Sequence, residues 1–284
     1  TGAEAENLDQ RLRKNYELAE ISKYLKDRYK KQEYSVSEKQ FYENIGDILV
    51  VKSKLPNEKL KEDPIELKKE SIYYYGLAGK NAKVMEQSSQ VGDLVSQKFK
   101  DLDEKIASET NLDKKIELES EATKLKKEAF NYYFTAQRWD EVEESLKQAA
   151  KSDFSIIADA TGRFKQARKI DDGIKIIEEI IKDNNDPQNK ALGYYALAKL
   201  TEKEEGKDFI TAGYAQTATS YLNEKGMPIL EYEKVIDARR TEAKIKSKWE
   251  NNPRALQFAE SIGKQTEIDV AVGLYDPNID ESNR

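Results

Sequence analysis

Apolar residues recur at spacings of three and four through the first part of the chain, the pattern of an amphipathic helix. Two rows follow each other within residues 3–32: Leu8, Leu12, Tyr16 and Ala19, and then Leu18, Ile21, Leu25 and Tyr29. The second row is rotated around the helix axis relative to the first. We therefore predict a helix over residues 3–32 that contacts neighbours on more than one side.

The same spacing predicts helices through most of the remaining chain, with prolines and glycines between them. Ser35 or Ser37 is the expected N-cap of the second helix, and Asp63 followed by Pro64 is typical of the start of the next. Residues 65–107 contain no proline and fit one long helix or two abutting helices. The later predicted helices are residues 112–137, 140–151, 154–169, 171–184, 189–204, 207–224, 228–250 and 253–265.

These helices predict an all-α fold, an elongated and bent array of long helices and helical hairpins that is partly similar to tetratricopeptide repeats. We expect a long-helix region at residues 1–109, a helical-hairpin region at 110–266 and an acidic tail at 267–284. Only residues 268–275 show the alternation of a short strand.

The likeness to tetratricopeptide repeats covers residues 130–225. Tyr133 occupies the place of an aromatic in the first helix of a repeat, and Trp139 with Asp140 occupies the turn. Asp140 and Asp172 are 32 residues apart, and Asp172 and Asp208 are 36 residues apart. Both spacings are close to the period of about 34 residues that such repeats have. This pattern predicts stacked helical hairpins, which typically bind a protein or peptide partner.

Tyrosine pairs recur in three of the predicted helices, within SIYYYGLAGK (71–80), NYYFTAQR (131–138) and GYYALAKL (193–200). Adjacent residues of a helix point about 100° apart, so the two rings of a pair cannot form one flat platform. We interpret the pairs mainly as packing, with exposed rings available for protein contacts, since tyrosine combines apolar area with a polar tip. The candidate contact residues are Tyr73, Tyr74, Tyr132 and Tyr194.

The chain contains neither cysteine nor histidine, which excludes disulfides, thiolate zinc sites and every catalytic triad that uses histidine. Residues 76–80, GLAGK, lack the earlier glycine and the following Ser or Thr of a phosphate-binding loop. Residues 276–282 place oxygen ligands as at the start of a calcium loop, but they lack its glycine and its final glutamate. We therefore expect no enzymatic activity, with no catalytic residue, cofactor or metal site.

Charge is distributed unevenly along a chain whose net charge is −6. Residues 11–31 carry eight Lys/Arg against three acids, whereas residues 267–284 carry five acids against Arg284 alone. The negative total argues against a protein that binds nucleic acid. A basic stretch at residues 239–249 instead suits an anionic protein surface. Its candidate contact residues are Arg239, Arg240, Lys244, Lys248 and Trp249.

No apolar run approaches the roughly 20 residues that span a bilayer, so we expect no membrane insertion. The first residues, TGAEAENLDQ, are small and acidic, as after removal of a signal peptide. Cysteine-free chains are found in both the cytoplasm and the bacterial periplasm, so composition alone leaves both compartments open.

Residues 6–51, ENLDQRLRKNYELAEISKYLKDRYKKQEYSVSEKQFYENIGDILVV, resemble the flagellar coiling proteins of leptospiral spirochaetes, as does the general character of the chain. The resemblance implies an exported, periplasmic subunit of the flagellar filament sheath. Such a subunit binds the flagellin core and other sheath proteins, self-associates on the filament, and promotes coiling and motility. That family has no catalytic residues to transfer. A tetratricopeptide-like adaptor for a protein or peptide stays open as the alternative.

Overall fold

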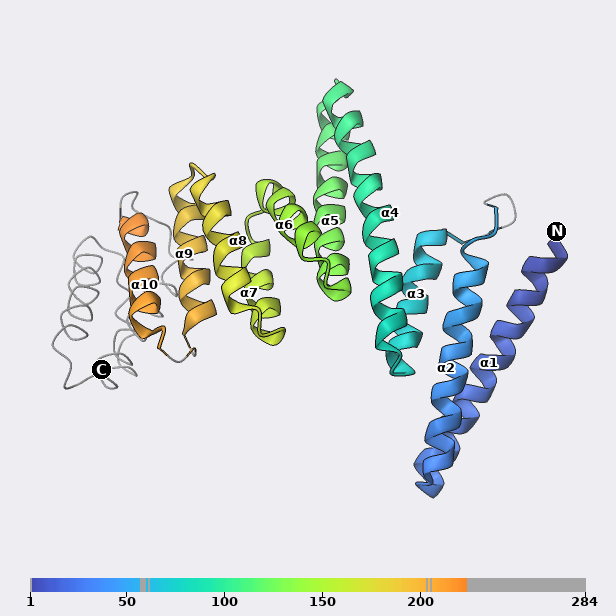
Figure 1. The fold of residues 1–284 in the computed structure, drawn as a ribbon. Coiled ribbons are helices and arrows are strands. Elements are labelled where there is room, and N and C mark those ends of the chain that lie inside the picture. The colour runs from blue at the N-terminus through green and yellow to red at the C-terminus, as the bar shows by residue number, and fades with distance from the viewer. Residues whose placement is uncertain (1, 57–59, 61, 203, 205, 224–284) are drawn as a thin grey trace, which may run out of the picture. The chain divides into compact units, whose positions relative to one another are not determined.

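The computed structural model describes residues 2–56, 60, 62–202, 204 and 206–223, and within these residues the chain is all-α, as predicted. The helices of this part are α1 (Gly2–Tyr29), α2 (Gln32–Lys52), α3 (Pro64–Leu77), α4 (Asn81–Ser108), α5 (Leu112–Ala136), α6 (Trp139–Ser152), α7 (Ile156–Gln166), α8 (Ile170–Lys182), α9 (Pro187–Thr201) and α10 (Asp208–Asn223) (Figure 1). The helices predicted at 228–265 and the strand predicted at 268–275 lie outside the described residues.

The chain divides into two compact units, residues 1–149 and 150–284. In the first unit, consecutive helices pack together, α1 on α2, α2 on α3, α3 on α4 and α4 on α5 (Figure 1). In the described part of the second unit, α7 contacts α8 and α9, α8 packs on α9, and α9 packs on α10. The boundary predicted after residue 109 falls in the turn between α4 and α5, and the tail predicted at 267–284 lies outside the described residues.

Local sequence explains several of the helix starts. The carboxylate of Asp63 accepts a hydrogen bond from the backbone N–H of Ile65 at 2.8 Å, with Pro64 as the first helical residue. Asn111 caps α5 in the same way, at 3.0 Å from the N–H of Lys114. The stretch 65–107 contains two helices rather than one, because the chain turns at Gly79 with φ +72°.

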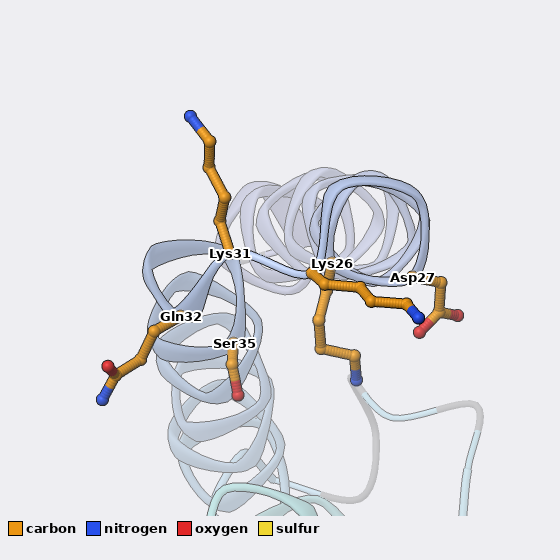
Figure 2. Close-up of a pocket in the computed structure, with 6 residues that line it drawn as sticks. Lys26, Asp27, Lys31, Gln32 and Ser35 are labelled. Carbon is orange, nitrogen blue, oxygen red and sulfur yellow. The ribbon is translucent and has the colours of Figure 1, made fainter.

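The predicted cap of α2 is wrong. The helix begins at Gln32, earlier than Ser35 or Ser37, and Figure 2 shows Lys31 and Gln32 at its start. The reason is the turn before it, in which Lys30 adopts a left-handed φ of 52° and reverses the chain within two residues. Both serines are therefore inside the helix, and the hydroxyl of Ser37 donates back to the carbonyl oxygen of Glu33 at 3.1 Å.

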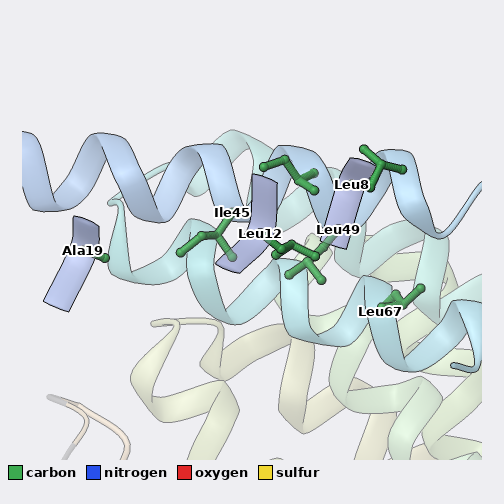
Figure 3. Close-up of a cluster of buried hydrophobic side chains, with 7 residues drawn as sticks. Leu8, Leu12, Ala19, Ile45, Leu49 and Leu67 are labelled. Atoms are coloured by element: carbon green, nitrogen blue, oxygen red, sulfur yellow. The ribbon is translucent and has the colours of Figure 1, made fainter. Parts of the chain in front are cut away.

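One hydrophobic cluster in the core of the first unit is built from one face of α1 together with α2 and α3. Its buried members are Leu8, Leu12, Ala19, Ile45, Ile48, Leu49 and Leu67 (Figure 3). This confirms the first predicted row of α1, and each buried leucine contributes about 1.5–3 kcal/mol of transfer free energy. In the second row Leu18 and Leu25 are half-buried, but Ile21 and Tyr29 are each 54% exposed, so neighbouring helices cover this row only in part.

The second tyrosine of two pairs packs against a glycine of a neighbouring helix. Tyr75 covers Gly46 of α2, where an added Cβ would lie 2.6 Å from Cε1 of the ring. Tyr133 covers Gly92 of α4, where an added Cβ would lie 2.8 Å from Cε1 of the Tyr133 ring. Both rings are buried, which confirms the packing interpretation for these two residues. A glycine is needed at each position because the ring occupies the space of a side chain.

A carboxylate and a cation complete the first of these contacts. The hydroxyl of Tyr75 donates to Oδ1 of Asp47 at 2.7 Å. Lys83 bonds to the same oxygen at 2.7 Å, and its Nζ lies 5.1 Å from the centre of the Tyr75 ring. The carboxylate of Glu43, one helical turn before Gly46, accepts a second bond from Lys83 at 3.0 Å. The ring is thus fixed by packing, a hydrogen bond and a cation–π contact.

The second contact repeats this arrangement in α4 and α5. The hydroxyl of Tyr133 donates to Oδ1 of Asp93 at 3.1 Å, and Arg138 bonds to the same oxygen at 2.7 Å. The guanidinium carbon of Arg138 lies 5.0 Å from the ring centre, and the guanidinium also donates to Ser89 at 2.9 Å. Ser89 precedes Gly92 by three residues, as Glu43 precedes Gly46. The pairs α2–α3 and α4–α5 therefore share one Gly-Asp and Tyr contact, which Lys83 of α4 completes in the first case and Arg138, after the end of α5, in the second.

Candidate protein-contact surface

Four tyrosines from three helices meet on the surface of the first unit. Tyr74 of α3 is central, with its ring centre 5.5 Å from that of Tyr16 in α1, 5.9 Å from that of Tyr42 in α2 and 5.2 Å from that of Tyr73. We call these four residues the first tyrosine cluster. Tyr73 is 61% exposed, whereas the other three are half-buried and pack against the hydrophobic core, so the cluster lies where the core meets the surface.

Carboxylates fix the orientation of two of these rings. The hydroxyl of Tyr16 donates to Oε1 of Glu70 at 2.7 Å, and that of Tyr42 donates to Oε1 of Glu38 at 3.2 Å. Burial, followed by the neighbouring carboxylate, raises the pKa of Tyr16 and raises the pKa of Tyr42 to about 12. Both hydroxyls therefore stay protonated well above physiological pH, and their hydrogen bonds hold the rings in place. A surface of this kind loses little side-chain entropy when a partner covers it.

Tyr132 of α5, another predicted contact residue, is half-buried near an ion pair between α3 and α5. Lys69 of α3 bonds to Glu128 of α5 at 2.5 Å and to Glu66 at 2.8 Å. Tyr132 follows Glu128 by four residues, one turn of α5, so it lies near this ion pair. Burial raises the pKa of Tyr132 to about 12, and the charge of Glu128 adds to this effect.

A second group of tyrosines occupies α9 and α10 in the second unit. The ring of Tyr194 stacks on that of Tyr221 at 5.8 Å with an interplanar angle of 7°, and lies 6.3 Å from that of Tyr214. The hydroxyl of Tyr214 donates to Oε1 of Glu178 in α8 at 2.6 Å. Lys190 places its Nζ 5.7 Å from the ring centre of Tyr221. We call Tyr194, Tyr214 and Tyr221 the second tyrosine cluster.

Sequence reasoning therefore located part of each cluster. Tyr73 and Tyr74 belong to the first cluster, Tyr194 belongs to the second, and Tyr132 belongs to neither. The other predicted contact residues lie outside the described residues: Arg239, Arg240, Lys244, Lys248 and Trp249. The cluster members that were missed are Tyr16, Tyr42, Tyr214 and Tyr221, which belong to no tyrosine pair. For the last two, the signal was their seven-residue spacing on one helix face.

Two further findings limit the chemistry of the described part of the chain. Its side chains include no group of three or more potential metal ligands, the acids included, close enough together to hold an ion. Among its helices, none combines the length and the apolar character needed to cross a membrane.

No protein-family model matches this chain, and no curated protein matches its sequence.

Proposed function

We propose that this chain is a non-enzymatic structural protein, a subunit of the sheath of a periplasmic flagellar filament. In this role it binds the flagellin core and neighbouring sheath proteins and promotes the coiling of the filament, and with it motility. The observation that carries the proposal is the presence of a fixed tyrosine cluster on the surface of each compact unit. The resemblance of residues 6–51 to flagellar coiling proteins supplies the choice of a filament as the partner.

Tyrosine clusters suit contacts that must be repeated many times along a filament. Each ring offers a large apolar area at a low entropy cost, and its hydroxyl adds a hydrogen bond at the rim. One chain with a cluster on each unit can engage two surfaces at once. Individually weak contacts then become strong, because every subunit on the lattice is held by several of them.

The experiment is co-sedimentation of the purified chain with isolated flagellar filaments over a salt series. We expect saturable pelleting at many copies per filament. Tyr73→Ala should weaken it, whereas Leu112→Ala should not. The pair is matched, since Tyr73 is 61% exposed and Leu112 is 70% exposed, so neither change disturbs a core. Absence of pelleting, also when a second sheath protein is added, would contradict the proposal.

A helical adaptor that binds a single protein or peptide is the second candidate. The observation that favours it is the stacked pair of Tyr194 and Tyr221 with Lys190 beside it, a polar and aromatic surface on the α9–α10 hairpin. An adaptor saturates at one partner per chain, whereas a sheath subunit covers a filament continuously. A pull-down that captures a peptide partner, followed by titration calorimetry with that peptide, would show the one-to-one binding of an adaptor. The co-sedimentation experiment would show the continuous coverage expected of a sheath subunit.

A further inference from the structure

The end of the hairpin formed by α1 and α2, residues 21–36, is both apolar and basic. Four of its apolar side chains are more than half exposed: Ile21, Tyr24, Tyr29 and Val36. Residues 23–31 also contain five basic side chains and the single acid Asp27. We call residues 21–36 the hairpin end. An exposed surface that combines these two properties is typical of an interaction site.

The aromatic part of the hairpin end is ordered by Arg28. Its guanidinium donates to the hydroxyl of Tyr24 at 2.6 Å and lies 5.9 Å from the centre of that ring and 5.7 Å from that of Tyr29. The ring of Tyr34, at the start of α2, lies 6.4 Å from Tyr29. The apolar area is therefore presented in a defined arrangement that joins both helices.

The basic part surrounds a hollow of about 410 Å³ between the two helices. Lys26, Asp27, Lys30, Lys31, Gln32 and Ser35 line it (Figure 2). Lys26 is paired with Glu38 at 2.6 Å, and the exposed Lys31 with Glu33 at 3.7 Å. Lys23 and Lys30 have no carboxylate within ion-pair distance in the described part of the chain. The hairpin end therefore has positive charge that is not balanced by its own fold.

Residues 267–284 have the complementary composition. They carry five acids, and apolar residues alternate at Ile268, Val270, Val272 and Leu274. An acidic and apolar segment matches the hairpin end in both charge and hydrophobicity. We infer that the hairpin end of one copy of this chain binds residues 267–284 of a second copy. The choice of a second copy rests on the proposed function, since a coat requires contacts between its subunits.

This contact is heterologous, because the two complementary surfaces are different parts of the chain. The hairpin end belongs to the first compact unit and residues 267–284 to the second. A head-to-tail contact leaves one free surface at each end of the growing series, so it extends without closing unless the rotation between copies forms a ring. It therefore suits the addition of subunits along a filament.

A charge exchange tests the inference in the full chain. Lys30→Glu/Lys31→Glu makes the hairpin end acidic, and Asp276→Lys/Asp280→Lys/Glu281→Lys makes the segment basic. Sedimentation velocity over concentration and salt series should show that the unmodified chain self-associates and that each variant alone does so about tenfold more weakly. A mixture of the two variants should form a one-to-one complex. The control, Lys98→Glu/Lys100→Glu, changes two exposed lysines of α4 by the same charge and should leave self-association unchanged.

The outcomes that overturn the inference are distinct. A mixture that stays monomeric shows that the two surfaces do not meet between copies. Association of the variants at the strength of the unmodified chain shows that these charges are not involved. A chain that carries both changes and only becomes more compact, without association, shows that the segment binds its own hairpin end. If the mixture dimerises but no chain pellets with filaments, the proposed function fails and this inference holds.

Discussion

The ring of Tyr75 lies directly on the backbone of Gly46, so that a Cβ at position 46 would be 2.6 Å from Cε1 of the ring. The same relationship joins Tyr133 to Gly92, and in both cases the residue after the glycine is an aspartate that accepts a hydrogen bond from the tyrosine hydroxyl. Two successive hairpins of the first unit are thus assembled by one repeated contact.

Gly46→Ala should destabilise the first unit, because the added methyl group forces a buried ring to move. We expect a loss of about 1–3 kcal/mol, the usual cost of overpacking. Gly76→Ala is the matched control in α3, where nothing lies within 4 Å of an added Cβ. It should increase stability by about 0.5–1 kcal/mol through helix propensity. Urea unfolding measures both, and equal effects of the two changes would contradict the packing account.

Loss of the tyrosine hydroxyls tests the hydrogen-bonded part of the contact. Tyr75→Phe keeps the ring on Gly46 but removes the bond to Asp47, and it should cost about 1 kcal/mol in the free energy of unfolding. Tyr73→Phe is the control, since that residue is exposed and its hydroxyl has no partner in the described part of the chain. A Tyr75→Phe variant as stable as the Tyr73→Phe variant would show that the bond contributes nothing.

Two buried lysines should respond in opposite ways to replacement by methionine. Lys68 bonds to the neutral side chain of Gln90 at 2.6 Å, and burial lowers its pKa. Lys68→Met should therefore be neutral or stabilising by about 1 kcal/mol. Lys52 instead bonds to Asp9 at 2.6 Å and to Glu62 at 2.8 Å. Lys52→Met should destabilise by about 1–2 kcal/mol, since two charge-assisted bonds are lost. Thermal unfolding measures the change in stability of each variant. If both variants were destabilised, or both stabilised, the proposed difference between the two lysines would be wrong.

Stability should fall in alkaline solution as tyrosines ionise in the unfolded chain. The pKa of Tyr42 and of Tyr132 is about 12 in the folded protein, against an ordinary value of 10.0. The folded state keeps protons that the unfolded state loses between these values, so the free energy of unfolding decreases as pH rises from 10 to 12. Below pH 10 the contribution is fully present. Urea midpoints measured across this window should fall less steeply for Tyr42→Phe/Tyr132→Phe than for the unmodified chain. An identical slope for the two proteins would show that these tyrosines are not the source of the pH dependence.

Local signals were sufficient for most of the described fold. The apolar row of α1 and the Asp63-Pro64 start each depend on residues close together in sequence, so periodicity and capping chemistry predicted them. The cap of α2 was missed because it depends on the left-handed turn at Lys30, a conformation that lysine rarely adopts.

The clusters were harder to predict, because their members are distant in sequence. Tyr16 and Tyr42 meet at Tyr74 only after three helices have packed, and nothing near either residue indicates the meeting. The Gly-Asp pairs at 46–47 and 92–93 were a readable signal of the repeated contact. Their role follows only when the tyrosine that each glycine faces is known.

The central claim is that this chain covers a filament rather than binding a single site. Electron microscopy of isolated flagellar filaments, saturated with the purified chain, tests it most directly. The account predicts decoration along the whole length of the filament, with the number of bound copies proportional to that length and reduced by Tyr73→Ala. Bare filaments, or chains bound only at filament ends, would contradict it.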